Sequence, residues 1–352
     1  MPPAKRCVYL LCCAALLGAA LGERRPARAQ APVLARDTIL YNGAADLRYR
    51  DTDKETRGSY IAATRFQADW TRRDRPGDAE RAGARVQILL ETDGRGTRVN
   101  RLRTSELYGF YNFSFTGVAA RVKVGQFVLP FGLMSVYDTP LQPIQPLYEK
   151  ALGLRVDTGV AVEGEYGPYR YVGAITTGAG PNRLDSGGGM ITFRLSRTVA
   201  TRMGNIEVGG SLLSGRGPVT ASDTELPASG WTGVRRYVDK TRIAGDGQYL
   251  RGPVLLRGEI VFGGDGEDPV WGYFAEGNYR LTPGVTLVAF RRLWNFPEEP
   301  MSSATTGVGV NHALGRGVVL RLLYEFQRDV PLPAGSSPVA IKRLTLQTRL
   351  DF

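Results

Sequence analysis

All three cysteines of the 352-residue chain lie in its first thirteen residues, so a thiol is absent from everything that follows. They belong to a stretch that begins with Lys5 and Arg6, continues as an apolar run to Leu21 and reaches Ala27-Arg28-Ala29. This order is typical of a secretory signal peptide. We therefore expect residues 1–29 to be a signal peptide and residues 30–352 to form one domain without disulfide bonds. An uncleaved anchor is the alternative, although about fifteen apolar residues are short for a membrane-spanning helix.

Long apolar runs are missing after residue 29, which excludes a helical membrane protein. Long amphipathic helical patterns are missing too, yet 43% of the chain is hydrophobic and must be buried somewhere. The formal charge is +11, of which residues 1–29 contribute five cations and one acid, leaving +7 for the rest. Because arginines and acids interleave there rather than cluster, the sequence argues against a nucleic-acid partner.

Histidine is represented only by His312, and no serine lies in a G-x-S-x-G pattern. The phosphate-binding G-x-x-x-x-G-K-[ST] pattern and the EF-hand calcium loop are also missing. The acidic, glycine-rich segment 263–268 is interpreted as a solvated turn. We therefore expect no catalytic residues, no cofactor and no metal site. An enzyme, or a binding or adhesion scaffold, is the alternative that these residues leave open.

What the sequence does contain is apolar residues with a period of two, the pattern of strands with one apolar face. The clearest case is residues 318–327, where Leu320, Leu322 and Tyr324 alternate with polar positions that include Arg321 and Glu325. The same alternation marks residues 41–49, 82–91, 105–115, 121–127, 156–165, 169–177, 189–195, 206–213, 254–262, 271–281 and 344–352.

Three features favour a transmembrane barrel over a soluble sandwich. Arg and Glu occur in mid-strand, which a wet lumen accepts and a dry core does not. The chain ends on Phe352, and a terminal aromatic strand resembles the signal read by the outer-membrane assembly machinery. Aromatic residues also mark strand ends, as expected for girdles at the membrane interfaces; they are Tyr41, Tyr49, Trp70, Tyr108, Phe115, Trp271, Tyr279, Tyr324 and Phe326.

The sequence therefore predicts an all-β fold, a transmembrane antiparallel β-barrel in the bacterial outer membrane. At about twenty residues per strand and connection, the length predicts sixteen strands, with fourteen and eighteen open. A barrel of this width leaves an aqueous channel. Residues 128–155 contain four prolines and cannot form a central strand. We interpret them as a constriction loop folded into the lumen; an external flap is the alternative.

Two short motifs follow each other at the start of the proline-containing segment, Gly125-Gln126-Phe127 and Pro130-Phe131-Gly132, and a third, Arg257-Gly258-Glu259, occurs later. In these motifs the sequence resembles the phosphate-selective porin O and P family. The resemblance spans residues 106–352. It implies a sixteen-stranded channel that is usually a homotrimer.

Within this fold, Arg121 and Lys123 share one strand face, opposite Val122 and Val124, and are expected to point into the lumen. Few lysines follow the signal peptide, and acids accompany the cations of residues 128–155, so a weak anion preference is expected rather than phosphate selectivity. We expect a passive diffusion channel for small hydrophilic solutes or ions. The expected pore-lining residues are Arg121, Lys123, Asp138, Glu149, Lys150, Arg155, Arg257, Glu259, Arg321 and Glu325.

Overall fold

The protein is described by a computed structural model that covers residues 36–52, 58–75, 78–91, 101–115, 118–133, 142–147, 151–181, 188–218, 237–295, 302–315, 317–330 and 339–352. Within these residues no helix is long and apolar enough to cross a membrane. The predicted signal peptide and the predicted pore-lining residues Asp138, Glu149 and Lys150 lie outside the described residues.

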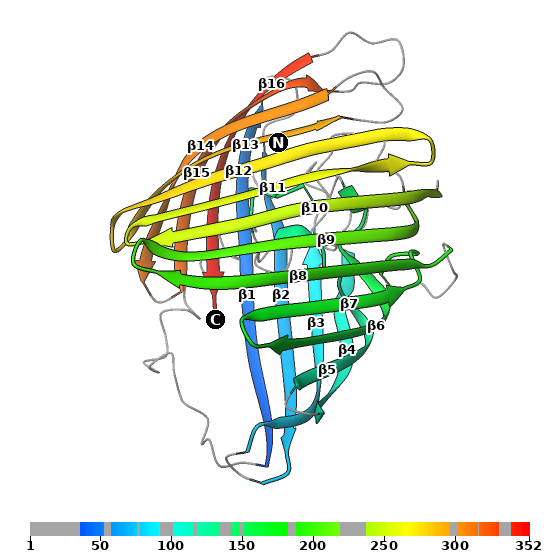
Figure 1. The fold of residues 1–352 in the computed structure, drawn as a ribbon. Coiled ribbons are helices and arrows are strands. Elements are labelled where there is room, and N and C mark those ends of the chain that lie inside the picture. The colour runs from blue at the N-terminus through cyan, green and yellow to red at the C-terminus, as the bar shows by residue number, and fades with distance from the viewer. Residues whose placement is uncertain are drawn as a thin grey trace.

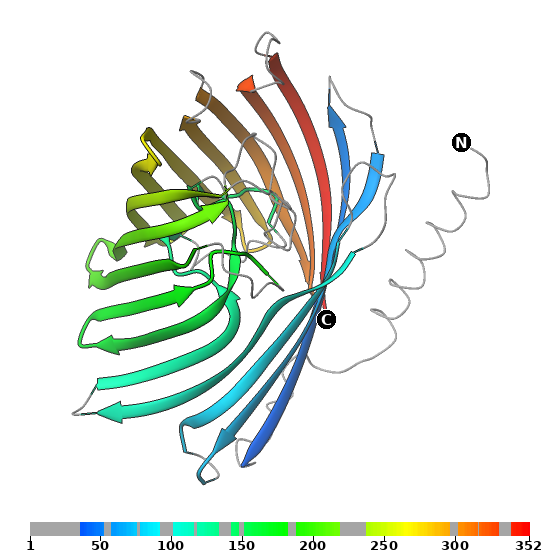
Figure 2. The same ribbon diagram turned by 90° about the vertical axis from the view of Figure 1, so that its right-hand side faces the viewer.

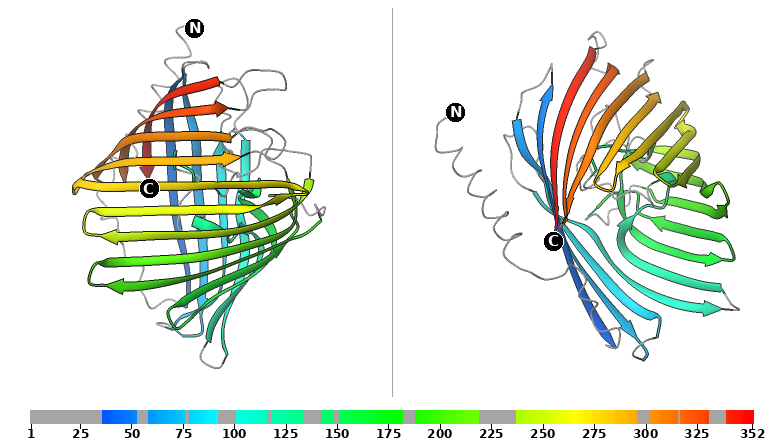
Figure 3. Two further views of the ribbon diagram at one scale, coloured as in Figure 1. Left: turned by 45° about the horizontal axis from the view of Figure 1, so that its top comes forward. Right: turned by 90° about the vertical axis from the view of Figure 1, so that its left-hand side faces the viewer.

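Sixteen antiparallel strands form one closed barrel in which each strand pairs with its sequence neighbours and β1 pairs with β16. Figure 1 shows β1 in blue beside β16 in red, and Figure 3 shows the wall closing around the lumen. The strands are β1 Asp37–Thr52, β2 Gly58–Arg73, β3 Glu80–Glu91, β4 Arg101–Phe115, β5 Val118–Val128, β6 Val156–Tyr166, β7 Tyr169–Thr176, β8 Met190–Thr201, β9 Gly204–Pro218, β10 Tyr237–Arg251, β11 Val254–Asp265, β12 Asp268–Thr282, β13 Val285–Asn295, β14 Ser302–Gly315, β15 Val318–Val330 and β16 Val339–Asp351. The predicted fold class and strand number are confirmed.

Connections differ in length between the two ends of the barrel, and Figure 2 shows the strands running between these ends. At one end, six of the seven connections contain only two residues, as between Tyr166 and Tyr169 or between Arg251 and Val254, and the β2–β3 connection contains six. At the other end, the connection between β5 and β6 runs from residue 129 to residue 155. Outer-membrane barrels have short turns on the periplasmic side and long loops outside. We call the first end the short-turn end.

Alternation of side chains along each strand separates an outer face from an inner one. On β15, Leu322 and Tyr324 are exposed on the outside, whereas the alternate residues Arg321, Leu323 and Glu325 are buried inside the barrel. The outer face as a whole carries exposed aliphatic and aromatic residues of every described strand. This is the distribution required when the outside faces lipid and the inside faces water.

Among the predicted girdle residues whose side chains the structure describes, Tyr41, Trp70, Trp271 and Tyr279 are exposed on the outer face. Tyr108 is not: it is buried inside the barrel, where Lys123 and Arg85 lie over its ring at 5.3 and 5.9 Å. Its prediction as a girdle residue was wrong, because the exposed residues Leu107 and Tyr111 place the odd-numbered positions of β4 on the outer face and Tyr108 on the inner one. There its ring serves as a partner for cations.

The seam between β1 and β16 is closed by Phe352 and Gly43, whose backbone groups exchange two hydrogen bonds of 2.7 and 2.9 Å. The Phe352 ring lies over Gly43, so a Cβ at this glycine would be 2.3 Å from the ring. It also packs edge-on against Phe66, with the ring centroids 6.0 Å apart. Phe352 therefore bridges the first two strands of the barrel and its last.

Deleting Phe352 is expected to lower the amount of folded barrel in the outer membrane severalfold, because the seam loses two hydrogen bonds and an aromatic contact. Heat-modifiable mobility on gels of membrane fractions measures this yield. Phe352→Tyr, which keeps the backbone and the ring, is the matched control and should retain the wild-type yield. Full yield from the deletion variant would show that closure does not depend on this residue.

Leu322→Arg is expected to destabilise the barrel by about 2–4 kcal/mol, since it places a charge on the lipid-facing side near mid-strand. Leu322→Met changes the shape but not the polarity and should cost much less. Denaturant titration of the protein in lipid vesicles gives both values. Similar losses from the two variants would mean that position 322 does not face hydrocarbon.

Candidate constriction site

The connection between β5 and β6 turns into the barrel directly after β5. Its two ends stay together, since the Leu129 amide donates a hydrogen bond of 3.0 Å to the Arg155 carbonyl. Its described apolar side chains are all buried: Leu129, Phe131, Leu133, Ile144, Leu147, Ala151, Leu152 and Leu154. The prediction of an inward-folded loop over residues 128–155 is confirmed for these residues.

An apolar patch on the inner wall receives this loop. The patch is formed by inward residues of β8–β13 and β15, namely Met190, Leu213, Ala244, Val261, Val270, Phe274, Val288, Phe290, Trp294 and Leu323. Full burial of one large aliphatic or aromatic side chain contributes about 1.5–3 kcal/mol. Because the loop buries several such side chains, apolar contact is the main attraction between the loop and this part of the wall.

Backbone hydrogen bonds fix the position of the loop on the patch. The Gly132 amide donates to the Ser211 hydroxyl at 3.0 Å, and the Leu133 amide donates to Glu259 Oε2 at 2.7 Å. Further along, Arg242 donates to the Ala151 carbonyl at 3.0 Å. Arg292 donates to the carbonyl of residue 145 at 3.1 Å. The loop is therefore fastened to four strands, β9, β10, β11 and β13.

Gly132 is the point where the two motifs of the sequence resemblance meet. It has a φ of +55°, a left-handed conformation that favours glycine. A Cβ at this position would be 2.4 Å from Glu259 Oε2. The Pro130-Phe131-Gly132 turn and the Arg257-Gly258-Glu259 strand segment thus contact each other across the lumen, and Glu259 holds the loop rather than facing open solvent.

The charged side chains next to the loop are buried from solvent and form ion pairs. The Lys240 and Arg242 side chains on β10 are fully buried, and both bind the carboxylate of Asp265 on β11. The neighbouring Arg194 binds Asp246 at 2.6 Å and is also almost completely buried. Buried ions need such partners, because desolvating them alone costs several kcal/mol. We call this side of the barrel, β8–β13, the dry wall.

Charges on β2–β6 keep contact with solvent, and we call this side the wet wall. Lys123 binds Glu163 at 2.6 Å, and Arg121 lies 3.7 Å from the same carboxylate. Arg85 binds Asp69 at 2.6 Å. The Arg85, Arg121 and Glu163 side chains are 33%, 31% and 30% exposed, in contrast to 0% for Arg242. Solvent therefore reaches the lumen along the wet wall.

The other predicted pore-lining residues occupy distinct positions. Arg155, at the end of the loop, is buried and donates to the Ser105 hydroxyl at 3.0 Å. Arg257 lies 3.6 Å from Glu276, and Glu325 lies 3.7 Å from Arg343. Arg321 donates to Asn311 and Gln347. Within the described residues, the partners of Arg121 and Lys123 are on β3, β4 and β6, so we assign these two cations to the wet wall.

The Lys240–Arg242–Asp265 cluster was not predicted from the sequence. Its signal was available, because in residues 237–251 the polar side chains Lys240, Arg242 and Asp246 are spaced two residues or four apart. No group of three or more potential metal ligands occurs in the part of the chain that the structure describes.

No protein-family model and no curated protein matches the chain, whereas several solved structures do. An anion-selective porin from Comamonas acidovorans is 12% identical, with a TM-score of 0.67 over 90% of this chain and 100% of the porin. OmpT of Vibrio cholerae, an outer membrane protein in its trimer form, is 10% identical, with a TM-score of 0.65 over 90% and 100%. The outer membrane channel DcaP of Acinetobacter baumannii is 11% identical, with a TM-score of 0.61 over 90% and 97%. The fold is that of bacterial outer-membrane porins.

Glu259→Ala is expected to loosen the loop, because the Leu133 amide loses its buried acceptor. An unsatisfied buried group costs about 1–3 kcal/mol. Single-channel recordings should then show a more variable and larger conductance than the wild type. Glu259→Gln, which keeps an acceptor oxygen, should stay close to the wild type. Identical recordings from all three proteins would mean that this contact does not hold the loop.

Proposed function

We propose that the protein is a passive diffusion channel of the bacterial outer membrane, open to small hydrophilic solutes and ions with a weak preference for anions. The observation that carries the proposal is the asymmetric lumen: an apolar loop covers the dry wall, while the charges of the wet wall remain hydrated. A sixteen-stranded barrel is wide enough to leave an aqueous path beside such a loop. The similarity of the fold to that of porins also supports a channel function.

The alternative, a barrel enzyme, finds little support in the described residues. His312 lies on β14 in the outward-facing series with Val308, Val310 and Leu314, all of them exposed. An imidazole on the outer face is separated by the barrel wall from the serines and acids of the lumen. We therefore propose no catalytic role for the protein.

A weak rather than strong anion preference follows from how the lumen cations are paired. Rings of unpaired Arg or Lys favour anions. On the wet wall, however, Glu163 faces Lys123 and Arg121, and Asp69 faces Arg85, so much of the cationic field is cancelled. We also propose a distant relationship to the phosphate-selective porin O and P family. The contact between the Pro130-Phe131-Gly132 turn and the Arg257-Gly258-Glu259 segment supports it. We do not propose that phosphate is the substrate of this protein.

We further propose that the channel is a homotrimer surrounded by outer-membrane lipid. The trimer form of a protein with the same fold supports this oligomeric state. The exposed aliphatic and aromatic outer face provides the surface for both lipid and neighbouring subunits.

The Arg121→Ala, Lys123→Ala double variant is expected to shift ion selectivity toward cations, because Glu163 then remains without these two partners. Reversal potentials across a salt gradient in planar bilayers measure the shift. Adding Glu163→Gln to the double variant should bring the potential back toward that of the wild type. The differences should shrink near 1 M salt, where the Debye length is about 3 Å. An unchanged reversal potential in the double variant would show that Arg121 and Lys123 do not lie along the conduction path.

A further inference from the structure

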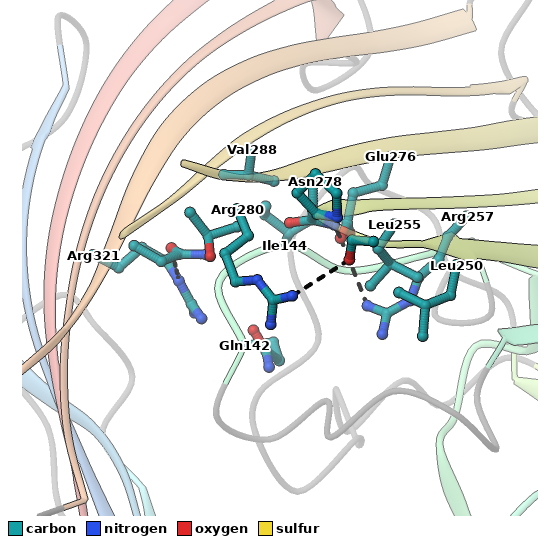
Figure 4. Close-up of a pocket in the computed structure, with 14 residues that line it drawn as sticks. Gln142, Ile144, Leu250, Leu255, Arg257, Glu276, Asn278, Arg280, Val288 and Arg321 are labelled. Carbon is teal, nitrogen blue, oxygen red and sulfur yellow. Dashed lines mark hydrogen bonds and ion pairs between the residues drawn. The ribbon is translucent and has the colours of Figure 1, made fainter. Parts of the chain in front are cut away.

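A cavity of about 260 Å³ lies inside the barrel, between the loop and the short-turn end. Gln142 and Ile144 of the loop form one side of it. The opposite side is formed by β10–β15 and by the β10–β11 turn, which contributes Gly252 and Pro253. Figure 4 shows the cavity, with its arginine side chains directed toward the space beside Gln142. None of the loop contacts described above fills this space.

Positive charge dominates the lining. Among the lining residues that the structure describes, three guanidinium groups, from Arg257, Arg280 and Arg321, face the cavity together with one carboxylate, that of Glu276. Glu276 lies 3.6 Å from Arg257 and also accepts a hydrogen bond from Asn278. In this described part of the lining, positive charges outnumber negative ones by two. This is unlike the wet wall, where each cation discussed above faces a carboxylate.

Arg280 is the cation most available to a ligand. Its side chain is exposed, and it donates one long hydrogen bond of 3.4 Å to the Gly252 carbonyl. Arg321, in contrast, is positioned by Asn311 and Gln347, which accept from two different nitrogens. One guanidinium is thus held in place and another is free to move onto a bound anion. Arginine pairs with carboxylates through two parallel hydrogen bonds, which favours a planar carboxylate over a spherical ion.

Apolar side chains complete the cavity. Ile144, Leu250, Leu255 and Val288 line it together with the arginines. A hydrated inorganic anion gains nothing from such a surface, whereas an organic anion can bury its hydrocarbon part there. The volume is below the roughly 300–1,000 Å³ of pockets for drug-sized ligands, so the ligand must be small.

We propose that this cavity is a binding site for small organic monocarboxylates with an apolar body, of the size of benzoate. The inference rests on the proposed channel function and names the solute class that the channel selects. The carboxylate lies between Arg280 and Arg321, and the apolar body contacts Leu250 and Leu255, the lining leucines that keep exposed surface. The cavity is lined by β10–β15, on the side of the lumen away from the wet wall, so bound benzoate is expected to reduce the current partly, by narrowing the lumen beside the loop.

Benzoate block of the open channel tests the proposal. Single channels in planar bilayers in dilute chloride are exposed to benzoate, acetate or inorganic phosphate from the short-turn side. We expect benzoate to reduce the current at a concentration at least tenfold lower than acetate or phosphate requires. Acetate carries the same carboxylate without the apolar body, and phosphate carries more charge without either feature. Equal block by the three anions would overturn the proposal.

Arg280→Gln is expected to raise the half-blocking benzoate concentration about tenfold. Arg170→Gln is the matched control, since it removes the same charge from the short-turn end of β7, outside the cavity lining, where Arg170 pairs with Glu165. It should leave the benzoate concentration within about twofold of the wild type. An equal rise of the half-blocking concentration in the two variants would mean that block depends only on the total charge of the lumen, and would overturn the proposal.

The two proposals can fail separately. A protein that conducts but is not blocked by benzoate refutes the carboxylate site and leaves the channel function intact. A protein that does not conduct refutes the channel function. In that case NMR tests the site independently. The detergent-solubilised wild type should broaden the resonances of benzoate, and Arg280→Gln should not.

Discussion

Closure of the sheet is the constraint on which the rest of this structure depends. In hydrocarbon every backbone N–H and C=O must find a partner within the protein, so an open sheet edge is not tolerated. The β1–β16 pairing removes that edge, and the Gly43–Phe352 contact completes it. Once the barrel is closed, the period of two along each strand assigns every side chain to lipid or to lumen. The position of each charge then follows from its place in the sequence.

The lumen loop divides the inside of the barrel into two electrostatic environments. Where Phe131 and its neighbours cover the wall, water is excluded. The charged side chains there form ion pairs, such as Lys240 and Arg242 with Asp265, because an unpaired buried ion would be costly. On the uncovered side, the same kinds of residue stay partly exposed to solvent. In the proposed channel, the apolar character of the loop would serve conduction indirectly, because it fixes which wall stays wet.

Much of the fold was predictable from the sequence, because a membrane barrel imposes a simple alternation. The loop boundaries at residues 128 and 155 agree with the end of β5 and the start of β6, since prolines exclude a central strand. Four strands, β2, β10, β13 and β14, were not identified by alternation. Strand β10 carries charges on the buried face and few large apolar residues on the other, and β13 contains Arg291 next to Arg292. Contacts such as Glu259 with the Leu133 amide join residues 126 positions apart and leave no local signal.

Net charge alone gives a poor account of what this lumen does to anions. Arg242 is neutralised in the dry wall and contributes to loop position, and Lys123 is held by Glu163 at the solvent boundary. Arg280 makes only a long contact to a backbone carbonyl and lies in a cavity with excess positive charge. Three cations of the same formal charge thus occupy different environments: Arg242 fastens the loop, Lys123 lies on the hydrated wall, and Arg280 lies in the cavity that we propose as a carboxylate site. What distinguishes them is the access of water and the number of carboxylates in reach, and both are set by where the loop lies.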